Sequence, residues 1–274
     1  MAKAESITVH ADGVDVVVSN PGKVFFPQRG ETKLDLIEYY RAVAEPFMEW
    51  IRGRPVMMER YPNGVGGKSW WQKRVPAGTP EWVHTTEVAT PNGTKSDALV
   101  VQDMAHVVWA VNLGCLGFHV WPFRAATPEH TDELRVDLDP SPGVGYHEVK
   151  QAARLARDLL GELGIRANVK TSGSRGLHIY VPLQPRWDSY QVRAAAVALA
   201  RLLEKRHPDL ITAQWWKEER GRRVFVDYNQ NAPHKTVFGA WCVRPRVGGQ
   251  VSTPLAWDEL DDVEPDDLTI ATVP

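Results

Sequence analysis

The segment 134–139 alternates apolar and acidic or basic residues without a break, and this alternation constrains the fold more than any other feature. Successive side chains of a β-strand point to opposite faces, so the pattern predicts a strand with one apolar face. Pro140 follows and ends the pattern. Three apolar side chains share the face that we expect to pack in a core: Leu134, Val136 and Leu138. Asp137 and Asp139 then share the opposite face with Arg135.

Two carboxylates on one strand face repel each other, and each is costly to bury without a partner. A metal ion removes that cost, and a ligand set of oxygens alone suits magnesium or manganese. Asp227 ends a second apolar strand, predicted at 223–228, and becomes a third ligand if the two strands are neighbours. The alternative is that Asp137 pairs with a basic side chain and Asp227 caps a turn.

A glycine and serine turn at 172–176 precedes a predicted strand that carries His178. Small residues allow the backbone to approach a ligand closely, so its N–H groups can surround an anion. Ser172 offers a hydroxyl, Arg175 offers a forked cation suited to phosphate, and His178 can donate a hydrogen bond. The alternative is an ordinary hairpin turn. Carboxylates that bind metal beside a phosphate-binding turn are what a nucleoside triphosphate requires.

Strands and helices are interspersed along the chain without a regular alternation, which predicts an α+β fold with mixed sheets. One long helix is expected to begin after Thr32, with Asp35 completing a capping box, and to run to Ile51. Further helices are predicted at 102–113, 147–163 and 189–205. Further strands are predicted at 6–20 (two strands around Asp12-Gly13), 54–60, 117–123 and 168–181 (two strands around the turn).

The chain has 274 residues and a formal net charge of −2, which by itself does not suggest a polyanionic partner. However, the segment 258–267 holds seven acidic residues and no basic one, so the rest of the chain is net basic. Phosphate binding depends on local basic patches such as 217–223, not on total charge. Only two cysteines are present, Cys115 and Cys242, so neither a disulfide framework nor a zinc module is expected.

The order of these motifs resembles that of the archaeo-eukaryotic primase superfamily. Within it, the chain resembles the polymerase domain of bacterial end-joining DNA ligase D proteins over nearly its whole length. The resemblance rests on these segments: NPGKVFFP, ETKLDLIEYY, ERYPNGVGG, FHVWPF, VDLDP, TSGSRGLHIY and VFVDYNQN. It implies a single primase-polymerase catalytic domain over residues 1–274. This domain would have mixed and antiparallel sheets flanked by helices, no zinc module, and an acidic, loosely packed C-terminal tail at 258–274.

The resemblance also implies a nucleotidyltransferase that adds nucleotides, preferably ribonucleotides, to a 3′ hydroxyl. Asp137, Asp139 and Asp227 match the family's catalytic metal ligands, with two divalent ions, usually Mn²⁺ and otherwise Mg²⁺. Six residues match positions that contact the incoming NTP or dNTP: Ser172, Arg175, His178, His119, Gln230 and Arg244. Arg175 stands where family members often carry lysine, so the positive charge is kept.

The remaining matched positions concern DNA. Asn20, Lys23 and Lys33 match a pocket for the 5′ phosphate of a gap or downstream strand. Trp70 and Trp71 match adjacent aromatic residues that stack on template bases, and two tryptophans beside glycines are not both expected to be buried. The segment 82–97 is expected to be a mobile loop.

The expected function is therefore template-dependent synthesis during DNA end joining or gap-filling repair. A metal-dependent nuclease or phosphatase would also use clustered carboxylates, but it gives the 172–178 segment no role. A non-catalytic module that binds DNA ends is the third candidate. We expect a bacterial, cytoplasmic, nucleoid-associated protein without a membrane contact. We also expect it to stand alone and to work with a separate ATP-dependent DNA ligase and an end-binding protein.

Overall fold

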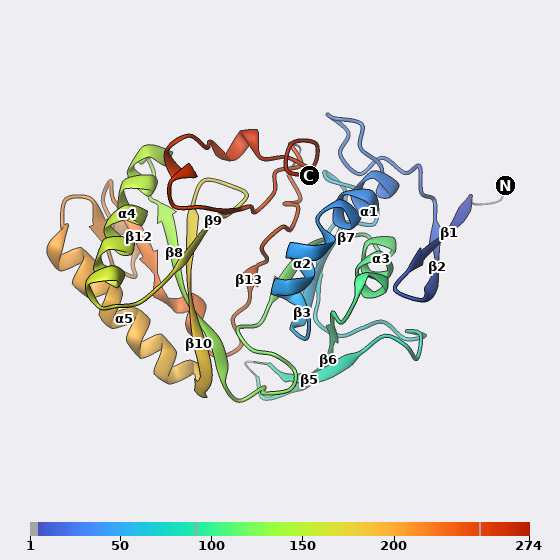
Figure 1. Cartoon of the computed structure of the whole chain (residues 1–274), viewed down its shortest axis with the longest axis horizontal. Coiled ribbons are helices and arrows are strands. Elements are labelled where there is room, and N and C mark those ends of the chain that lie inside the picture. The colour runs from blue at the N-terminus through green and yellow to red at the C-terminus, as the bar shows by residue number, and fades with distance from the viewer. Residues whose placement is uncertain (1–4, 91, 247) are drawn as a thin grey trace. The chain divides into compact units, whose positions relative to one another are not determined.

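The computed structural model describes residues 5–90, 92–246 and 248–274, which fall into two compact units. Unit 1 comprises the residues up to Trp121 together with Phe238–Ser252 and Asp266–Pro274. Unit 2 comprises Pro122–Val237 and Thr253–Pro265. Each unit has its own sheet and its own hydrophobic core (Figure 1).

Unit 1 is built on a sheet of order β13-β7-β3-β6-β5, with β4 paired to β3, and on a separate β1-β2 hairpin. Its strands are β1 (Ser6–Ala11), β2 (Val14–Ser19), β3 (Pro55–Arg60), β4 (Trp70–Gln72), β5 (Thr85–Ala89), β6 (Lys95–Val100), β7 (Cys115–Val120) and β13 (Val237–Phe238). Its helices are α1 (Lys33–Ala42), α2 (Ala44–Ile51) and α3 (Met104–Asn112). The predicted turn between β1 and β2 is confirmed, with Asp12 and Gly13 both at positive φ.

The long helix expected from Thr32 to Ile51 is wrong in one respect, because it is two helices that meet at Val43. The predicted capping box is confirmed: Thr32 accepts from the Asp35 backbone, and the Asp35 carboxylate accepts from the Thr32 backbone. Pro46 explains the break, since it has no N–H to donate to the carbonyl of residue 42 and its ring would clash there. In the first turn of α2, a proline is tolerated.

The loop expected at 82–97 is also wrong, because the segment contains β5 and the start of β6, which pair as an antiparallel hairpin. Val88 is buried on β5, and β6 continues into the buried Leu99 and Val100, where it pairs with β3. Alternating threonine, valine and alanine residues favour a half-buried strand. The apolar end of β6 fixes its register against the sheet.

Unit 2 contains a mixed sheet of order β11-β12-β8-β10-β9-β14, in which β11 and β12 are parallel and the other neighbouring strands are antiparallel. Its strands are β8 (Thr131–Pro140), β9 (Asn168–Thr171), β10 (Leu177–Trp187), β11 (Ile211–Thr212), β12 (Val224–Asp227) and β14 (Pro254–Leu255). Its helices are α4 (Tyr146–Glu162) and α5 (Ser189–Arg206). Four short 3₁₀ segments follow later in the chain: η1 (Lys217–Glu219), η2 (Tyr228–Asn231), η3 (Glu259–Asp261) and η4 (Pro265–Asp267), the last of which crosses into unit 1.

One face of the unit 2 sheet packs against α4 and α5, which lie beside each other on that face (Figure 1). Its core includes the three apolar residues predicted on β8 and matching residues of β10 and β12: Leu134, Val136, Leu138, Leu177, Ile179, Val181, Val224 and Val226. The predicted alternation is therefore confirmed. The other face of the same strands carries the polar and acidic side chains of the candidate site.

The acidic segment near the C-terminus is packed, not loose. Leu260 is fully buried in the unit 2 core. Lys150 of α4 donates to the Asp261 carbonyl and pairs with Glu264, and Arg154 pairs with Asp261. The acidic residues thus lie along a basic stripe of α4. The ion pairs with α4 and the buried leucine explain why this acidic segment is packed, which its composition alone does not predict.

The mixed sheet of unit 2, the antiparallel strand pairs of unit 1 and the helices confirm the predicted α+β class. Cys115 and Cys242 are both buried, and neither is part of a disulfide within the described residues. Over the described residues, no helix combines the length and the apolar character needed to cross a bilayer.

Candidate active site

Asp137, Asp139 and Asp227 lie together on the polar face of the unit 2 sheet. β8 is the central strand, and the antiparallel register places Asp227 of β12 directly opposite Asp137. On the other side of β8, His178 of β10 is also opposite Asp137. One oxygen from each of the three carboxylates falls within 4.8 Å of the others. The strand adjacency that the sequence left open is therefore present.

The surroundings of Asp227 fix its carboxylate in place. Its two oxygens accept hydrogen bonds from the Asn229 backbone N–H and from the Gln230 side-chain amide, both at 2.9 Å. Burial raises the pKa of the Asp227 carboxyl above its ordinary value, and these two hydrogen bonds oppose the shift. Asp227 also caps η2, so the simpler alternative of a turn cap is true as well. The cap and the cluster use the same side chain.

The turn at 172–176 closes directly beside the carboxylates. The Ser172 hydroxyl accepts from the backbone N–H groups of Ser174 and Gly176, at 3.2 and 3.1 Å. A Cβ at Gly176 would lie 2.6 Å from the Leu138 carbonyl and 3.4 Å from the Asp139 carboxylate. Only glycine permits this close approach, so the turn is tied sterically to the strand that bears Asp139.

The other predicted residues of unit 2 surround the same cluster. His178 is buried, and its Nε2 lies 3.4 Å from an Asp137 oxygen. Arg175 is exposed at the tip of the turn and, within the described residues, forms no hydrogen bond or ion pair. Gln230 is bonded to Asp227, so its amide lies beside the carboxylates. The structure thus brings the seven predicted residues of unit 2 into one region of its sheet.

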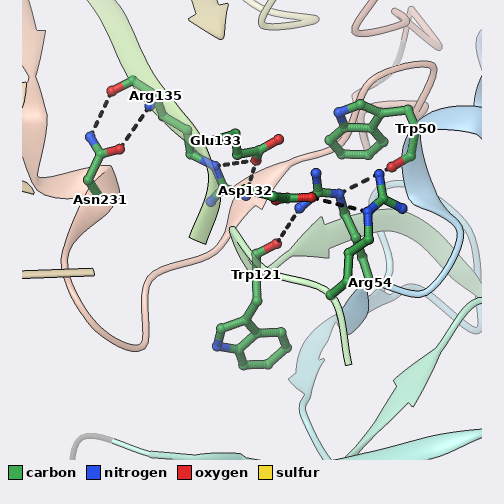
Figure 2. Close-up of polar contacts among 8 residues, drawn as sticks. Trp50, Arg54, Trp121, Asp132, Glu133, Arg135 and Asn231 are labelled. Atoms are coloured by element: carbon green, nitrogen blue, oxygen red, sulfur yellow. Dashed lines mark hydrogen bonds and ion pairs between the residues drawn. The ribbon is translucent and has the colours of Figure 1, made fainter. Parts of the chain in front are cut away.

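Asn231 fastens the end of β12 to the middle of β8. Where β12 turns into η2, the side-chain amide of Asn231 continues the ladder: it accepts from the Arg135 N–H at 2.8 Å and donates to the Arg135 carbonyl at 2.7 Å (Figure 2). Asn231 is 1% exposed. The Arg135 guanidinium is equally buried and pairs with Glu133 (Figure 2). These contacts hold β8 and η2 in the register that aligns the carboxylates.

In unit 1, His119 lies on β7 against Glu59 of β3. His119 Nε2 is 3.2 Å from a Glu59 carboxylate oxygen, and both side chains are only 12% exposed. Glu59 also accepts a hydrogen bond from the Tyr61 hydroxyl. Gly117 faces Glu59 across the strands, and a Cβ there would lie 3.0 Å from the Glu59 carboxylate. The glycine leaves room for the carboxylate to reach His119.

Trp70 and Trp71 are 45% and 51% exposed on β4, which confirms that they are not both buried. The Trp71 ring meets His119 edge to face, with centroids 4.3 Å apart. The Arg60 guanidinium lies over the Trp70 ring. Arg244 covers the ring of Phe238, which itself packs on His119. Trp71, His119 and Arg244 are therefore members of one aromatic and basic cluster.

Asn20 and Lys23 line a surface hollow of about 450 Å³ together with Glu5 and Gly22. The Lys23 ammonium donates to Asn63 at 2.7 Å. Lys33 is only 4% exposed and donates to the carbonyls of Ser19 and Asn112. Burial, and then the nearby Lys23 charge, lower the pKa of Lys33 to about 8.

The donor set at the unit 2 cluster fits a divalent ion. It consists of carboxylate oxygens alone, which magnesium and manganese prefer. Three carboxylates at this spacing repel one another, and a cation would relieve both this repulsion and the burial that raises the pKa of Asp227.

The sequence reasoning missed Glu59 and Asn231, although both lie in segments that carry the family resemblance. The alternation of side chains along β3 gives one indication of Glu59, because Glu59 lies on the same face of the strand as Met57, which pairs with His119. Nothing in the sequence marks Asn231, because its role depends on where β12 stops pairing.

Comparison with known proteins identifies the same family. The model of the LigD primase-polymerase domain matches residues 32–274. A non-homologous end joining DNA repair protein LigD of Mycobacterium tuberculosis is 35% identical over 255 residues, which is 90% of this chain and 34% of that protein. The bifunctional non-homologous end joining protein LigD of Bacillus subtilis is 30% identical over 92% of this chain and 40% of its own length.

The fold has a close counterpart among solved structures. The polymerase domain of Mycobacterium tuberculosis Ligase D, solved in complex with DNA, matches with a TM-score of 0.88 and 32% identity. The match covers 93% of this chain and 92% of that one. The chain spans about a third of the length of the mycobacterial relatives. From the matched segments, the sheet architecture and the three carboxylates, the chain belongs to the LigD primase-polymerase domain family, whose polymerase domain is a nucleotidyltransferase.

Proposed function

We propose that this chain is a DNA-dependent polymerase that adds nucleotides, preferably ribonucleotides, to a 3′ hydroxyl during DNA end joining or gap-filling repair. The observation that carries the proposal is the register that aligns Asp137, Asp227 and His178 across three strands, next to a turn of small residues. A nuclease or phosphatase needs the carboxylates but not the turn beside them.

Asp137 and Asp139 would hold two divalent ions, Mn²⁺ or Mg²⁺, and Asp227 would mainly hold the one near the primer hydroxyl. Bound ions supply neutralisation of phosphate charge and a more acidic 3′ hydroxyl. The chain itself supplies preorganisation. Gln230 and the Asn229 N–H orient the Asp227 carboxylate, and Asn231 keeps its strand in register.

The turn at 172–176 would bind the triphosphate. Its bends are maintained by the Ser172 hydroxyl and by Gly173 at positive φ, so the backbone stays in place without a ligand. Arg175, which is exposed, would contribute a cation to the phosphates, and His178 would donate to a phosphate oxygen from the strand that follows. A preformed cluster of donors stabilises the charge of the departing pyrophosphate.

His119 would contact the ribose 2′ hydroxyl, and Arg244 would lie near the same nucleotide. A 2′ hydroxyl needs a polar partner, and its bond to His119 would be absent for a deoxynucleotide. Glu59 fixes the orientation of the His119 ring through Nε2. The ribonucleotide preference thus depends on a pair of side chains, not on His119 alone.

DNA would be bound through unit 1. Asn20 and Lys23 would receive a 5′ phosphate in their surface hollow, with the Lys33 charge behind it. Trp70 and Trp71 expose ring surface on which template bases would stack. We further propose that both units act as one catalytic domain over residues 1–274, in a bacterial cytoplasm, with a separate ATP-dependent ligase and an end-binding protein.

The direct test is incubation of the protein with a labelled primer on a gapped duplex, NTPs or dNTPs, and Mn²⁺ or Mg²⁺. We expect extension by single nucleotides, with NTPs used more efficiently than dNTPs. Shortening of the primer would favour a nuclease. DNA binding without either change would favour a non-catalytic module that binds DNA ends.

A further inference from the structure

Trp215 and Trp216 form a second exposed aromatic pair, on unit 2. They are 45% and 65% exposed, and the proposed polymerase chemistry uses neither. Scattered single apolar residues are normal on a protein surface, but two adjacent indole rings form a contiguous apolar patch. Such a patch marks a contact surface. The basic cluster at 217–223 directly follows it in the chain.

The pair is held by an ordered loop. The Arg220 guanidinium donates to the carbonyls of Gln214 and Trp215, at 3.1 and 2.8 Å. The same guanidinium lies 3.5 Å from the ring centre of Phe225 on β12. β12 is the strand that ends at Asp227. The loop that presents the tryptophans is therefore anchored to a strand of the catalytic sheet. The loop then loses less conformational entropy when a ligand binds.

Beside the pair lies a hollow of about 390 Å³. Its walls include both tryptophans and Tyr228, together with four polar side chains: Arg201, Gln214, Glu204 and Glu219. The Trp215 and Tyr228 rings are 6.4 Å apart between centroids. Ring faces suit the face of a nucleobase, while the arginine, amide and carboxylate offer both donors and acceptors to its edge. The hollow combines the two kinds of contact that an unpaired base makes.

Two cations are available for phosphates: Arg201 in the wall of the hollow and Lys217, which follows Trp216 in the chain. The side chains of Arg201 and Lys217 are exposed and form no hydrogen bond or ion pair within the described part of the chain. Arg222 adds a third exposed guanidinium. An aromatic pair flanked by cations is the arrangement that binds single-stranded nucleic acid with little sequence preference.

We infer that Trp215 and Trp216 form a binding site for single-stranded DNA, distinct from the aromatic pair of unit 1. One base stacks on the exposed ring of Trp216 and reaches the hollow, while its neighbouring phosphates contact Arg201 and Lys217. The choice of DNA as the strand rests on the proposed function. An unpaired overhang is the substrate feature that a polymerase acting on broken ends meets and that a fully paired duplex lacks.

The test is the affinity of the full chain for a fluorescently labelled single-stranded oligodeoxynucleotide, measured by anisotropy with EDTA and without nucleotide. All variants carry Trp70→Ala and Trp71→Ala, so that the unit 1 pair does not contribute. We expect Trp216→Ala to weaken binding by about 5- to 150-fold, as the loss of one stacked base does. Trp216→Phe should keep most of the affinity. The control Trp187→Ala, which removes another exposed tryptophan elsewhere on unit 2, should not change it.

Equal affinity of the parent protein and Trp216→Ala overturns the inference, and so does an equal loss in Trp187→Ala. Because no metal ion or nucleotide is present, the assay does not report polymerase activity. A protein that extends primers but binds single strands without Trp216 therefore contradicts this inference alone. A protein that binds through Trp216 but never extends a primer contradicts the proposed function alone.

Discussion

At the scale of single residues, Glu59 influences the orientation and the tautomer of the His119 ring. The Glu59 carboxylate lies 3.2 Å from Nε2 of His119 and therefore favours a proton on that nitrogen. Without this carboxylate, the ring could adopt the other tautomer. A carboxylate bonded to a histidine in this way fixes both its orientation and its proton.

The first prediction concerns nucleotide choice. Glu59→Ala should lower the ratio of kcat/KM for an NTP to that for the matching dNTP by about fivefold to tenfold, the value of about one hydrogen bond. Tyr61→Phe is the matched control, since it removes the other donor to Glu59 and leaves His119 in place. An unchanged ratio in Glu59→Ala would remove Glu59 from the account.

Lys33 supports a prediction about pH. Its pKa in the folded protein is about 8, whereas the unfolded chain keeps the proton up to its ordinary value of 10.5. Between these values the unfolded state binds more protons, so the Lys33 contribution to the free energy of unfolding increases as pH rises from about 8 to about 10.5. Lys33→Met should lack this contribution.

The measurement is chemical denaturation of the wild type and Lys33→Met across this pH range. The difference in unfolding free energy between the two proteins should change in favour of the wild type as the pH increases. Parallel pH profiles would show that the Lys33 ammonium does not titrate as its buried position implies.

At the scale of elements, the sequence predicted strands better than their partners. Alternation placed 134–139 and 223–228 on strands with the correct faces, because one face of each packs in a core. No local pattern could show that β12 and β10 flank β8, since register depends on contacts between segments far apart in the chain. The break between α1 and α2 was predictable from Pro46, but the apolar face continued across it.

The same limit explains what was missing from the candidate site. Asp137, Asp139 and His178 were visible because their residue types and spacing carry chemistry. Asn231 was not, because an asparagine after a strand more often belongs to a turn. Its function here depends on the backbone of Arg135, which lies 96 positions earlier in the chain.

Asn231 gives the prediction at the element scale. Asn231→Ala removes two buried hydrogen bonds to the Arg135 backbone and leaves both groups without this partner, which should cost about 2–4 kcal/mol of unfolding free energy. Asn229→Ala is the control: its side chain accepts one bond from Arg193, and we expect a loss below about 1 kcal/mol. Urea unfolding of both variants measures the difference, and equal losses would contradict the role of Asn231 as a clamp.

At the scale of the whole molecule, the proposed functions are divided between the two units. Unit 2 carries the carboxylates and the triphosphate turn, and unit 1 carries the candidate contacts to the sugar, the template and the 5′ phosphate. Each unit has a separate core, so each can lose its ligand contacts without unfolding the other sheet. Variants of these unit 1 contacts should therefore change substrate choice, whereas variants of the unit 2 carboxylates should change chemistry.

Lys23→Ala tests this division. It should remove any preference for a gap with a 5′ phosphate over one without it, while extension on the unphosphorylated gap stays near the wild-type rate. Lys205→Ala removes an exposed lysine of unit 2 and should keep the preference. If Lys23→Ala still prefers the phosphorylated gap as the wild type does, the proposed pocket is wrong.

The most direct test of the central claim is primer extension by Asp137→Asn compared with the wild type, with DNA affinity measured on the same samples. Asparagine keeps the size of the side chain but removes the charge that would hold a divalent ion. We predict that extension with Mn²⁺ falls by more than about a hundredfold while DNA affinity changes less than about twofold. Extension at a rate comparable to the wild type would contradict the account.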